Sequence, residues 1–155
     1  MRIGYGYDVH RLKAGRPCIL CGVTIPSDFG PDGHSDADVA IHALIDALLG
    51  AAALGDIGTH FPDNDKKWKN ADSIFLLKQV YELVKNKGYT LSNADITISL
   101  ERPKLSGYIF QMRETVAAAI SVDIDRIGVK ATTEEGMGYI GSGEGISSSA
   151  VVLIE

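Results

Sequence analysis

The sequence lacks a hydrophobic run long enough to cross a membrane. Its longest apolar stretch, IHALIDALLGAAAL, is interrupted by Asp46 and falls short of the length of a membrane span. Met1 leads directly into strand-like sequence, so we expect no signal or transit peptide. We therefore expect a cytoplasmic protein without a membrane partner.

Basic residues are also scarce, and the sequence contains no basic stripe. The formal net charge is −5, which argues against nonspecific binding of nucleic acid. This mild charge does not exclude an anionic small ligand, because local groups and metal ions can outweigh it. Hydrophobic residues make up 45% of the chain and charged residues 23%, as in ordinary globular proteins. We expect one domain over residues 1–155, without internal repeats or linkers.

Cysteine is nearly absent, and the two cysteines form a single C-x-x-C motif at Cys18 and Cys21. A zinc ribbon requires a second pair of ligands, and none follows. A redox motif normally lies at the start of a helix, whereas CILCGVTIP is typical of a strand. We interpret both cysteines as small core residues.

The pattern of apolar and turn residues predicts alternating strands and helices. Residues 1–10 and 18–26 are expected to be strands that form a hairpin. A helix capped by Ser35 or Asp36 is predicted over 35–55, and a helix capped by Asp72 or Ser73 over 73–87, ending at Gly88. The remaining elements are strands at 90–101, 126–133 and 147–155 and a helix at 108–122. This order predicts an α+β fold, a two-layer sandwich whose mixed sheet carries the helices on one face.

Asp8 and His10 stand two residues apart in the first strand, so their side chains project to the same face. His42 lies within the apolar helix, with Asp38 and Asp46 one turn before and after it. One interpretation is a core histidine held by those aspartates. The other is a metal ligand whose second ring nitrogen donates a hydrogen bond to an aspartate. Asp8, His10 and His42 would then form a three-ligand zinc set with an open fourth position, which is the catalytic pattern.

Two further polar segments lie at the ends of predicted elements. In TTEEG, Glu134 and Glu135 are either a solvated pair or include a carboxylate that binds Mg²⁺ near phosphate. Thr132 and Thr133 add hydroxyl donors that suit a phosphate. His34 and Ser35 stand at the expected helix start, where free N–H groups suit an anion, although Ser35 can equally be a simple N-cap.

Four segments together resemble the 2-C-methyl-D-erythritol 2,4-cyclodiphosphate synthase family of the non-mevalonate isoprenoid pathway. They are YDVH, DGHSDADVAIHALIDALLGAAALGDIGTHFPD, RPKL and TTEEGMGYIGSGEGI, and the similarity extends over nearly the whole chain. The resemblance implies a sandwich of ferredoxin-like type with a four-stranded core. It also implies a homotrimer with active sites at subunit interfaces, Zn²⁺ on Asp8, His10 and His42, and a second cation, Mg²⁺ or Mn²⁺, on Glu135 and the substrate diphosphate.

The resemblance also implies the reaction and the residues that perform it. The substrate, 4-diphosphocytidyl-2-C-methyl-D-erythritol 2-phosphate, would attack its own β-phosphorus and release CMP, and the two cations would align the repelling phosphates. His34 and Thr133 would orient or stabilise the reacting phosphates. The implied substrate-binding residues are Asp8, His10, His34, Ser35, Asp56, Gly58, Asp63, Leu100, Pro103, Lys104, Leu105, Ser106, Ala131, Thr132, Thr133, Glu135, Tyr139 and Ser142.

Two positions depart from the pattern of that family. Tyr139 replaces a common phenylalanine, and Ser142 stands where many members have an arginine near the central channel of the trimer. Ser142 therefore weakens the expectation that the channel binds an isoprenoid diphosphate.

Two other functions remain open at this point. A phosphohydrolase that uses zinc-activated water would employ the same metal ligands but release free phosphate. A binding module with a structural metal would need a fourth protein ligand, and His60 is the remaining histidine that can supply it.

Overall fold

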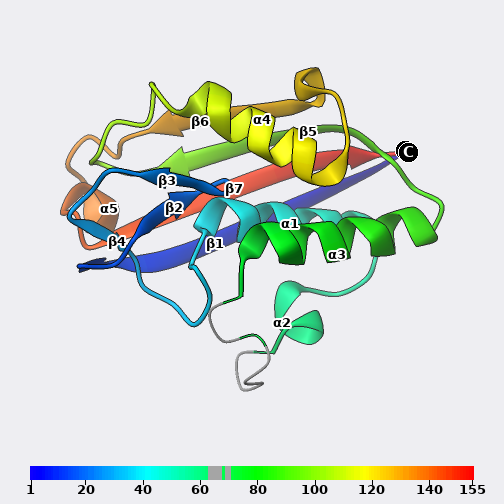
Figure 1. Ribbon diagram of the computed structural model, residues 1–155, viewed down its shortest axis with the longest axis horizontal. Coiled ribbons are helices and arrows are strands. Elements are labelled where there is room, and N and C mark those ends of the chain that lie inside the picture. The colour runs from blue at the N-terminus through cyan, green and yellow to red at the C-terminus, as the bar shows by residue number, and fades with distance from the viewer. Residues whose placement is uncertain (63–67, 69–70) are drawn as a thin grey trace.

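The protein, described by a computed structural model over residues 1–62, 68 and 71–155, has a mixed sheet with helices on one face (Figure 1). The sheet order is β4-β1-β7-β5-β6, in which only β5 and β6 are parallel neighbours within the described chain. Four long strands form its core, and the three-residue β4 extends one edge, so the expected α+β sandwich is confirmed. The strands are β1 (Arg2–Ala14), β4 (Phe29–Pro31), β5 (Leu91–Ser99), β6 (Ile127–Thr132) and β7 (Gly145–Ile154).

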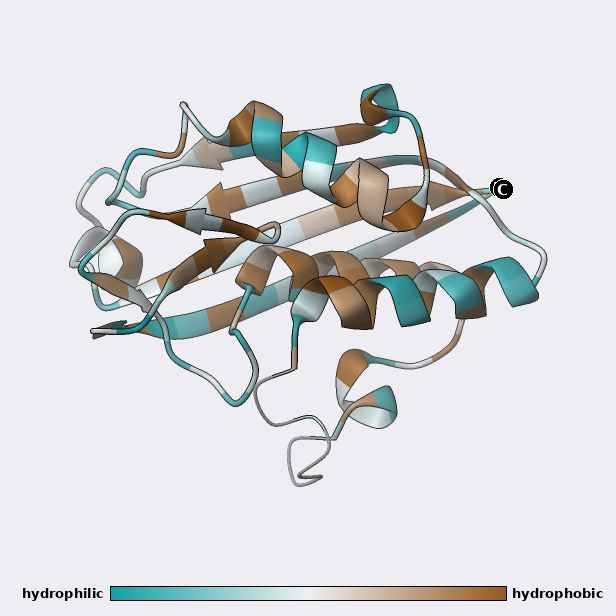
Figure 2. Ribbon diagram, viewed as in Figure 1, coloured by the Kyte–Doolittle hydropathy of each residue, from teal (hydrophilic) through white to brown (hydrophobic). Residues whose placement is uncertain are grey.

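The helices form a layer that is two deep over part of the sheet. α1 (Val39–Ala51) packs on β1 and β7, α3 (Ser73–Asn86) lies over α1, and α4 (Ile109–Ile120) packs near β6. Because α1 is enclosed by the sheet and by α3, it is hydrophobic around most of its circumference, whereas α3 alternates hydrophobic and hydrophilic residues (Figure 2). Segments expected to be loops contain the short helices α2 (Ile57–His60), η2 (Ile124–Arg126) and α5 (Gly138–Gly141). No helix of the described part is both long and apolar enough to cross a membrane.

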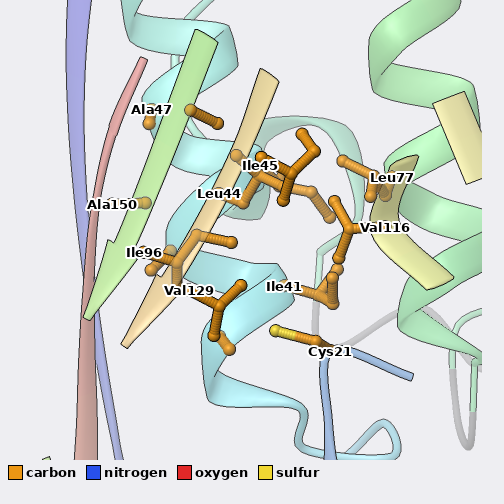
Figure 3. Packing of buried hydrophobic residues seen from close by; sticks show 14 of the residues in the cluster. Cys21, Ile41, Leu44, Ile45, Ala47, Leu77, Ile96, Val116, Val129 and Ala150 are labelled. Atoms are coloured by element: carbon orange, nitrogen blue, oxygen red, sulfur yellow. The ribbon is translucent and has the colours of Figure 1, made fainter. Parts of the chain in front are cut away.

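The core lies where α1 contacts the sheet, α3 and α4 (Figure 3). Cys21 reaches into this cluster, and Cys18 is also buried. Burial raises the pKa of Cys18 to about 11, and the pKa of Cys21 is likewise well above its ordinary value because the thiol is desolvated. The interpretation of both cysteines as inert core residues is consistent with this burial.

The segment that contains the cysteines differs from the expected single strand. It forms two short strands, β2 (Cys18–Leu20) and β3 (Val23–Ile25), which pair with each other rather than with β1. Cys21 and Gly22 turn the chain between them with φ of 51° and 75°, as in a type I′ hairpin. The buried carboxylate of Asp38 accepts hydrogen bonds from both of their N–H groups, at 3.0 and 2.7 Å. A long-range partner thus stabilises a turn that the local sequence only weakly indicates.

Two glycines allow α1 to lie directly against the backbone of β1. A Cβ atom at Gly4 would come within 1.9 Å of the Ala47 carbonyl oxygen, and one at Gly6 within 2.0 Å of the Ala43 carbonyl oxygen. No side chain fits into that space, so these glycines set how closely the helix approaches the strand. His42 on α1 therefore lies close enough to reach side chains of β1.

The other face of the sheet is left uncovered by the helices. Ile3, Tyr5, Tyr7 and Val9 of β1 point to this face, and 73% of Ile3 and 64% of Tyr5 are exposed. Val151 of β7 adds a further exposed apolar side chain. At the far end of the same strand pair, Arg2 pairs with Ile154, so the two ends of the chain lie side by side.

Candidate metal centre and active site

Asp8 and His10 face α1 because side chains alternate along β1. Gly4, Gly6, Asp8 and His10 share the inner face of the strand, while the large apolar residues between them face outward. The predicted common face of Asp8 and His10 is therefore confirmed. The close packing of α1 brings His42 to the same place.

The three side chains converge on one point. Asp8 Oδ2 lies 3.0 Å from His10 Nε2 and 2.9 Å from His42 Nδ1, and the two ring nitrogens are 3.4 Å apart. One ligand atom from each residue lies within 4.8 Å of the others, the only such group of three in the described chain. A carboxylate oxygen and two imidazole nitrogens are a donor set that suits Zn²⁺ and leaves a fourth position open. The predicted metal-capable group is thus present.

The charges of the cluster stabilise one another. Burial by itself raises the pKa of Asp8, but hydrogen bonds from His10 and His42 and their charge hold this pKa well below its ordinary value. Burial would lower the pKa of His10, yet the hydrogen bond and charge of Asp8 raise it above the ordinary value. The site therefore keeps Asp8 ionised, as a metal ligand must be.

The aspartates expected to hold His42 do not contact its ring. Asp38 Oδ1 accepts hydrogen bonds from the N–H groups of Cys21 and Ile41. Asp46 accepts one from the Ile57 N–H at 2.7 Å. Both carboxylates accept hydrogen bonds from backbone N–H groups, and buried N–H groups need such partners. Neither carboxylate is therefore available to the ring of His42 one helical turn away. The interpretation that Asp38 or Asp46 holds the ring of His42 was therefore wrong. His42 Nε2 instead lies 2.9 Å from Ser73 Oγ and 3.2 Å from Ser35 Oγ.

The start of α1 also differs from the expectation. The N-cap is Asp38, not Ser35 or Asp36, and the helix begins at Val39. Ser35 Oγ accepts from the Ala37 N–H at 3.0 Å, so the segment before the helix is a side-chain-stabilised turn. His34 and Ser35 consequently do not lie at a helix N-terminus with free N–H groups. At the second long helix, the predicted Asp72 cap is confirmed.

A cavity of about 340 Å³ opens beside the metal-capable cluster. His34 is exposed at this cavity. Ser35 also lines the cavity, and its Oγ lies 3.2 Å from His42 Nε2. Five lining residues were not anticipated from the sequence, since nothing in their local pattern marks them as functional. The lining residues are Asp8, His10, Gly33, His34, Ser35, His42, Ile57, Gly58, Phe61, Trp68 and Leu76.

The remaining residues predicted for this side lie around α2. Gly58 lines the cavity, and Asp56 caps α2 at its rim by accepting from Thr59 N–H at 2.8 Å. Asp63 lies outside the described residues. His60 Nε2 donates to the Leu54 carbonyl at 2.8 Å and does not join the metal-capable group. A fourth protein ligand from His60 is therefore absent from this arrangement.

A second hollow, of about 420 Å³, lies between the end of β6 and the start of α4. It gathers eight residues that were predicted to bind the cytidine part or the phosphates, from two segments about 30 positions apart. They are Leu100, Pro103, Lys104, Leu105, Ser106, Ala131, Thr132 and Thr133.

The TTEEG turn follows directly after β6. Glu135 is exposed with φ of 53°, and its carboxylate accepts from Thr133 Oγ1 at 3.1 Å. Glu101, which the sequence did not single out, holds this turn by accepting from Glu134 N–H at 2.7 Å. The turn thus presents Glu135 and Thr133 together toward solvent.

Tyr139 lies on the uncovered side of the sheet, where it meets Tyr7, and Ser142 follows at the end of α5. Tyr139 Oη lies 3.0 Å from Tyr7 Oη, and Ser142 Oγ lies 2.9 Å from a carboxylate oxygen of Glu144. Neither residue lines the metal-side cavity or the second hollow.

The two hollows are separated by the width of the sheet. Asp8 pairs with Ser148, Ser148 with Ile98, and Ile98 with Ala131, so these residues form one row across β1, β7, β5 and β6. Three strand spacings place Asp8 about 14 Å from Ala131. A single chain therefore keeps the metal-side residues and the β6 residues apart.

A charged metal-capable cluster beside a cavity, on an α+β sandwich, defines the class of a metal-dependent enzyme that acts on a small molecule. The comparison with protein families is more specific. The chain belongs to the YgbB family, whose model matches residues 1–155.

Individual relatives agree with this assignment and with the resemblance found in the sequence. The 2-C-methyl-D-erythritol 2,4-cyclodiphosphate synthase of Moorella thermoacetica is 61% identical over 154 residues, covering 99% of this chain and 94% of the relative. A solved 2C-methyl-D-erythritol-2,4-cyclodiphosphate synthase in a CDP-bound form is 42% identical with a TM-score of 0.91, covering 99% of this chain and 100% of that one. The bifunctional IspDF of Campylobacter jejuni is 45% identical with a TM-score of 0.96 over 99% of this chain, which spans 42% of that protein.

Proposed function

We propose that this protein converts 4-diphosphocytidyl-2-C-methyl-D-erythritol 2-phosphate to 2-C-methyl-D-erythritol 2,4-cyclodiphosphate and CMP, in the non-mevalonate pathway of isoprenoid precursor biosynthesis. The observation that carries the proposal is the convergence of Asp8, His10 and His42 beside a cavity, in a chain 61% identical to a protein named for that reaction. The substrate and CMP are multiply charged and cross a bilayer poorly, which supports action in the cytoplasm.

The reaction needs no nucleophile from the protein. An oxygen of the substrate's 2-phosphate forms a bond to the β-phosphorus, and the bond from that phosphorus to the oxygen of CMP breaks. The protein must hold two anionic groups in line and keep water away from them. Positioning of this kind lowers the barrier by about 7–11 kcal/mol at most.

Two groups of residues would hold the cations. Asp8, His10 and His42 would bind Zn²⁺, and Glu135 with the substrate diphosphate would bind Mg²⁺ or Mn²⁺. When bound, these ions supply Lewis-acid neutralisation of the phosphate oxygens. The cavity beside the Asp8 cluster is also lined by His34 and Ser35, so a phosphate held in it would lie near a cation bound by Asp8, His10 and His42.

The other predicted residues would orient the two ends of the substrate. His34 and Thr133 would donate to the reacting phosphates, and Ser35, Asp56 and Gly58 would contact the erythritol hydroxyls. The second hollow, with Lys104 and the backbone at Ala131, would take the cytidine and its phosphate. The CDP-bound form of a 42% identical relative supports a cytidine diphosphate group as the ligand.

We further propose a homotrimer with each active site shared between two subunits. On one chain Asp8 and Ala131, which lie at the metal-side cavity and the second hollow, are about 14 Å apart across the sheet, which supports a substrate site between copies. The uncovered sheet face, with Ile3, Tyr5 and Val9 exposed, supplies an apolar surface for a partner copy.

The decisive experiment is incubation of the protein with the cytidyl substrate and Mg²⁺, followed by ³¹P spectroscopy. We expect one CMP and one cyclic diphosphate for each substrate consumed. Release of inorganic phosphate instead would identify a phosphohydrolase and reject the cyclisation.

A structural metal is tested by the variant His60→Ala. Because His60 donates to the Leu54 carbonyl rather than joining the cluster, we expect bound zinc to remain at one per chain. Loss of zinc from this variant alone would indicate a closed four-ligand site and a binding module.

A further inference from the structure

Ser73 connects the metal-capable cluster to α3 through a hydroxyl that is shielded from solvent. It is the first residue of α3, none of its surface is exposed, and its Oγ lies 2.9 Å from His42 Nε2. The other ring nitrogen, Nδ1, faces Asp8 and His10. Ser73 therefore contacts His42 on the side away from the cation position.

The hydrogen-bond partners of Ser73 determine which nitrogen of His42 carries the proton. Ser73 Oγ donates its single proton in a short hydrogen bond to the Asp36 carboxylate. A carboxylate only accepts, and a serine hydroxyl has one proton to give. Toward His42 the Ser73 oxygen can consequently only accept, which requires a proton on Nε2. The lone pair of Nδ1 is then directed at Asp8 and His10.

Asp36 is itself held in place by the backbone. Asp36 Oδ2 accepts from the Ser73 N–H at 2.9 Å, Asp36 Oδ1 accepts from the Asp38 N–H at 3.2 Å, and the Asp36 N–H donates to the Ala71 carbonyl. These bonds prevent the carboxylate from turning away from Ser73. The other histidine uses a simpler device, because His10 Nδ1 lies 2.9 Å from the Asp32 carbonyl, which only accepts.

We propose that Ser73 and Asp36 are positioning residues that hold His42 in the Nε2–H tautomer and thereby present Nδ1 to the cation before it binds. Partners of this kind, which fix the tautomer of a histidine ligand, typically change metal affinity 10- to 100-fold. The proposal rests on the metal site of the proposed function but not on the substrate or the reaction.

The sharpest test is Asp36→Asn, which exchanges donor and acceptor roles along the hydrogen bonds from residue 36 through Ser73 to His42. The Ser73 N–H is bound at 2.9 Å and the Asp38 N–H at 3.2 Å, so the amide oxygen of the new side chain stays with the closer donor, Ser73 N–H. Its NH₂ group then donates to Ser73 Oγ. The Ser73 proton is then free to point at His42 Nε2, which favours the opposite tautomer. We expect two-bond ¹H–¹⁵N spectra of the metal-free protein to show His42 shifted toward the Nδ1–H form. Zinc affinity, measured by competition with a chromophoric chelator, should fall about 10- to 100-fold.

Two serine variants give an independent measure. Ser73→Ala removes the acceptor, but Ser35 Oγ at 3.2 Å remains as a weaker one, so we expect a smaller loss of zinc affinity than in Asp36→Asn. Ser73→Thr keeps the hydroxyl and should recover affinity relative to Ser73→Ala. This pair decides the matter if Asp36→Asn does not fold.

Asp72→Asn is the matched control, because it makes the same chemical change one residue before Ser73. Asp72 caps α3 by accepting from the Ile74 N–H, and asparagine caps helices equally well. We expect its zinc affinity and His42 tautomer to match the parent protein. An unchanged Nε2–H tautomer in Asp36→Asn, or equal zinc affinity in Ser73→Ala and Ser73→Thr, would overturn the proposal. Neither readout depends on turnover, so absence of the cyclisation would leave this result intact.

Discussion

The two faces of β1 differ in the size and polarity of their side chains. The inner face has glycine, glycine, aspartate and histidine at positions 4, 6, 8 and 10, while the outer face has isoleucine, two tyrosines and valine between them. The small and polar residues face the helices, and the large apolar residues face solvent in the single chain. The glycines of the inner face allow the close approach of α1, and its Asp8 and His10 belong to the metal-capable group. The exposed apolar residues of the outer face form the surface that we propose for a partner copy. In the proposed function, one side of β1 therefore serves the reaction and the other side serves assembly.

The largest effect is expected from removing a ligand on the inner face. His42→Ala leaves Asp8 and His10 without the third donor, so we expect zinc to be lost and turnover to fall about a thousandfold. Metal analysis and the ³¹P assay measure both quantities. The oligomeric state should stay unchanged, because His42 is on the covered side of the sheet, and retention of near-full activity in chelator would contradict the role of the cluster.

A methyl-bearing side chain on the inner face should separate helix and strand. Gly6→Val places atoms where a Cβ alone would come within 2.0 Å of the Ala43 carbonyl oxygen. We expect the free energy of unfolding to drop by about 3 kcal/mol, measured by urea denaturation, with weaker zinc binding because His42 moves with the helix. A variant of parental stability would mean that α1 is not held by this close contact.

A charge on the outer face should act on assembly alone. Tyr5→Asp would bury an unpaired carboxylate in the proposed trimer, at a cost of about 3–5 kcal/mol, while leaving the zinc cluster in place. Sedimentation should show dissociated chains that still bind zinc, with turnover lost. Gln79→Asp, the same charge change on the exposed side of α3, is the control and should remain assembled.

The smallest effect concerns acid stability of the metal-free protein. The pKa of Asp8 is lower in the folded than in the unfolded state, so its ionised form stabilises the fold above about pH 4, and this contribution is lost as the pH falls further. The pKa of His10 is raised by folding, so its contribution is present below about pH 6.5 and is lost as the pH rises. The free energy of unfolding, measured by urea denaturation, should rise with pH at about pH 4 and fall with pH at about pH 6.5. Asp8→Asn should weaken both dependences on pH.

Much of the site followed from periodicity, because periodicity governs which residues share a face. The two-residue spacing of Asp8 and His10 and the helical position of His42 were sufficient to predict one metal-capable group, which the structure confirms. The likeness to a known family supplied the cytidine-side residues, which no local pattern indicated. The structure brings eight of these residues together around one hollow, and their binding of cytidine stays a prediction.

The partners of His42 were not predictable, because they depend on tertiary packing. Asp38 and Asp46 have the right helical spacing, yet each carboxylate accepts a hydrogen bond from a backbone N–H group of another segment. Ser73 lies 31 positions from His42 and reaches it only because α3 packs over α1. The role of Gly4 and Gly6 is hidden for the same reason, since a glycine in a strand says nothing about which backbone approaches it.

The pairing of Arg2 with Ile154 has a consequence for engineering. Both chain ends lie at one end of β1 and β7, whereas Asp8 and His10 lie toward the other end of β1. A short linker between residues 1 and 155, with a new opening at the exposed bend around Gly15, would give a circular permutant with an undisturbed sheet. An affinity tag or a fused second protein attached at either end would likewise extend away from Asp8 and His10.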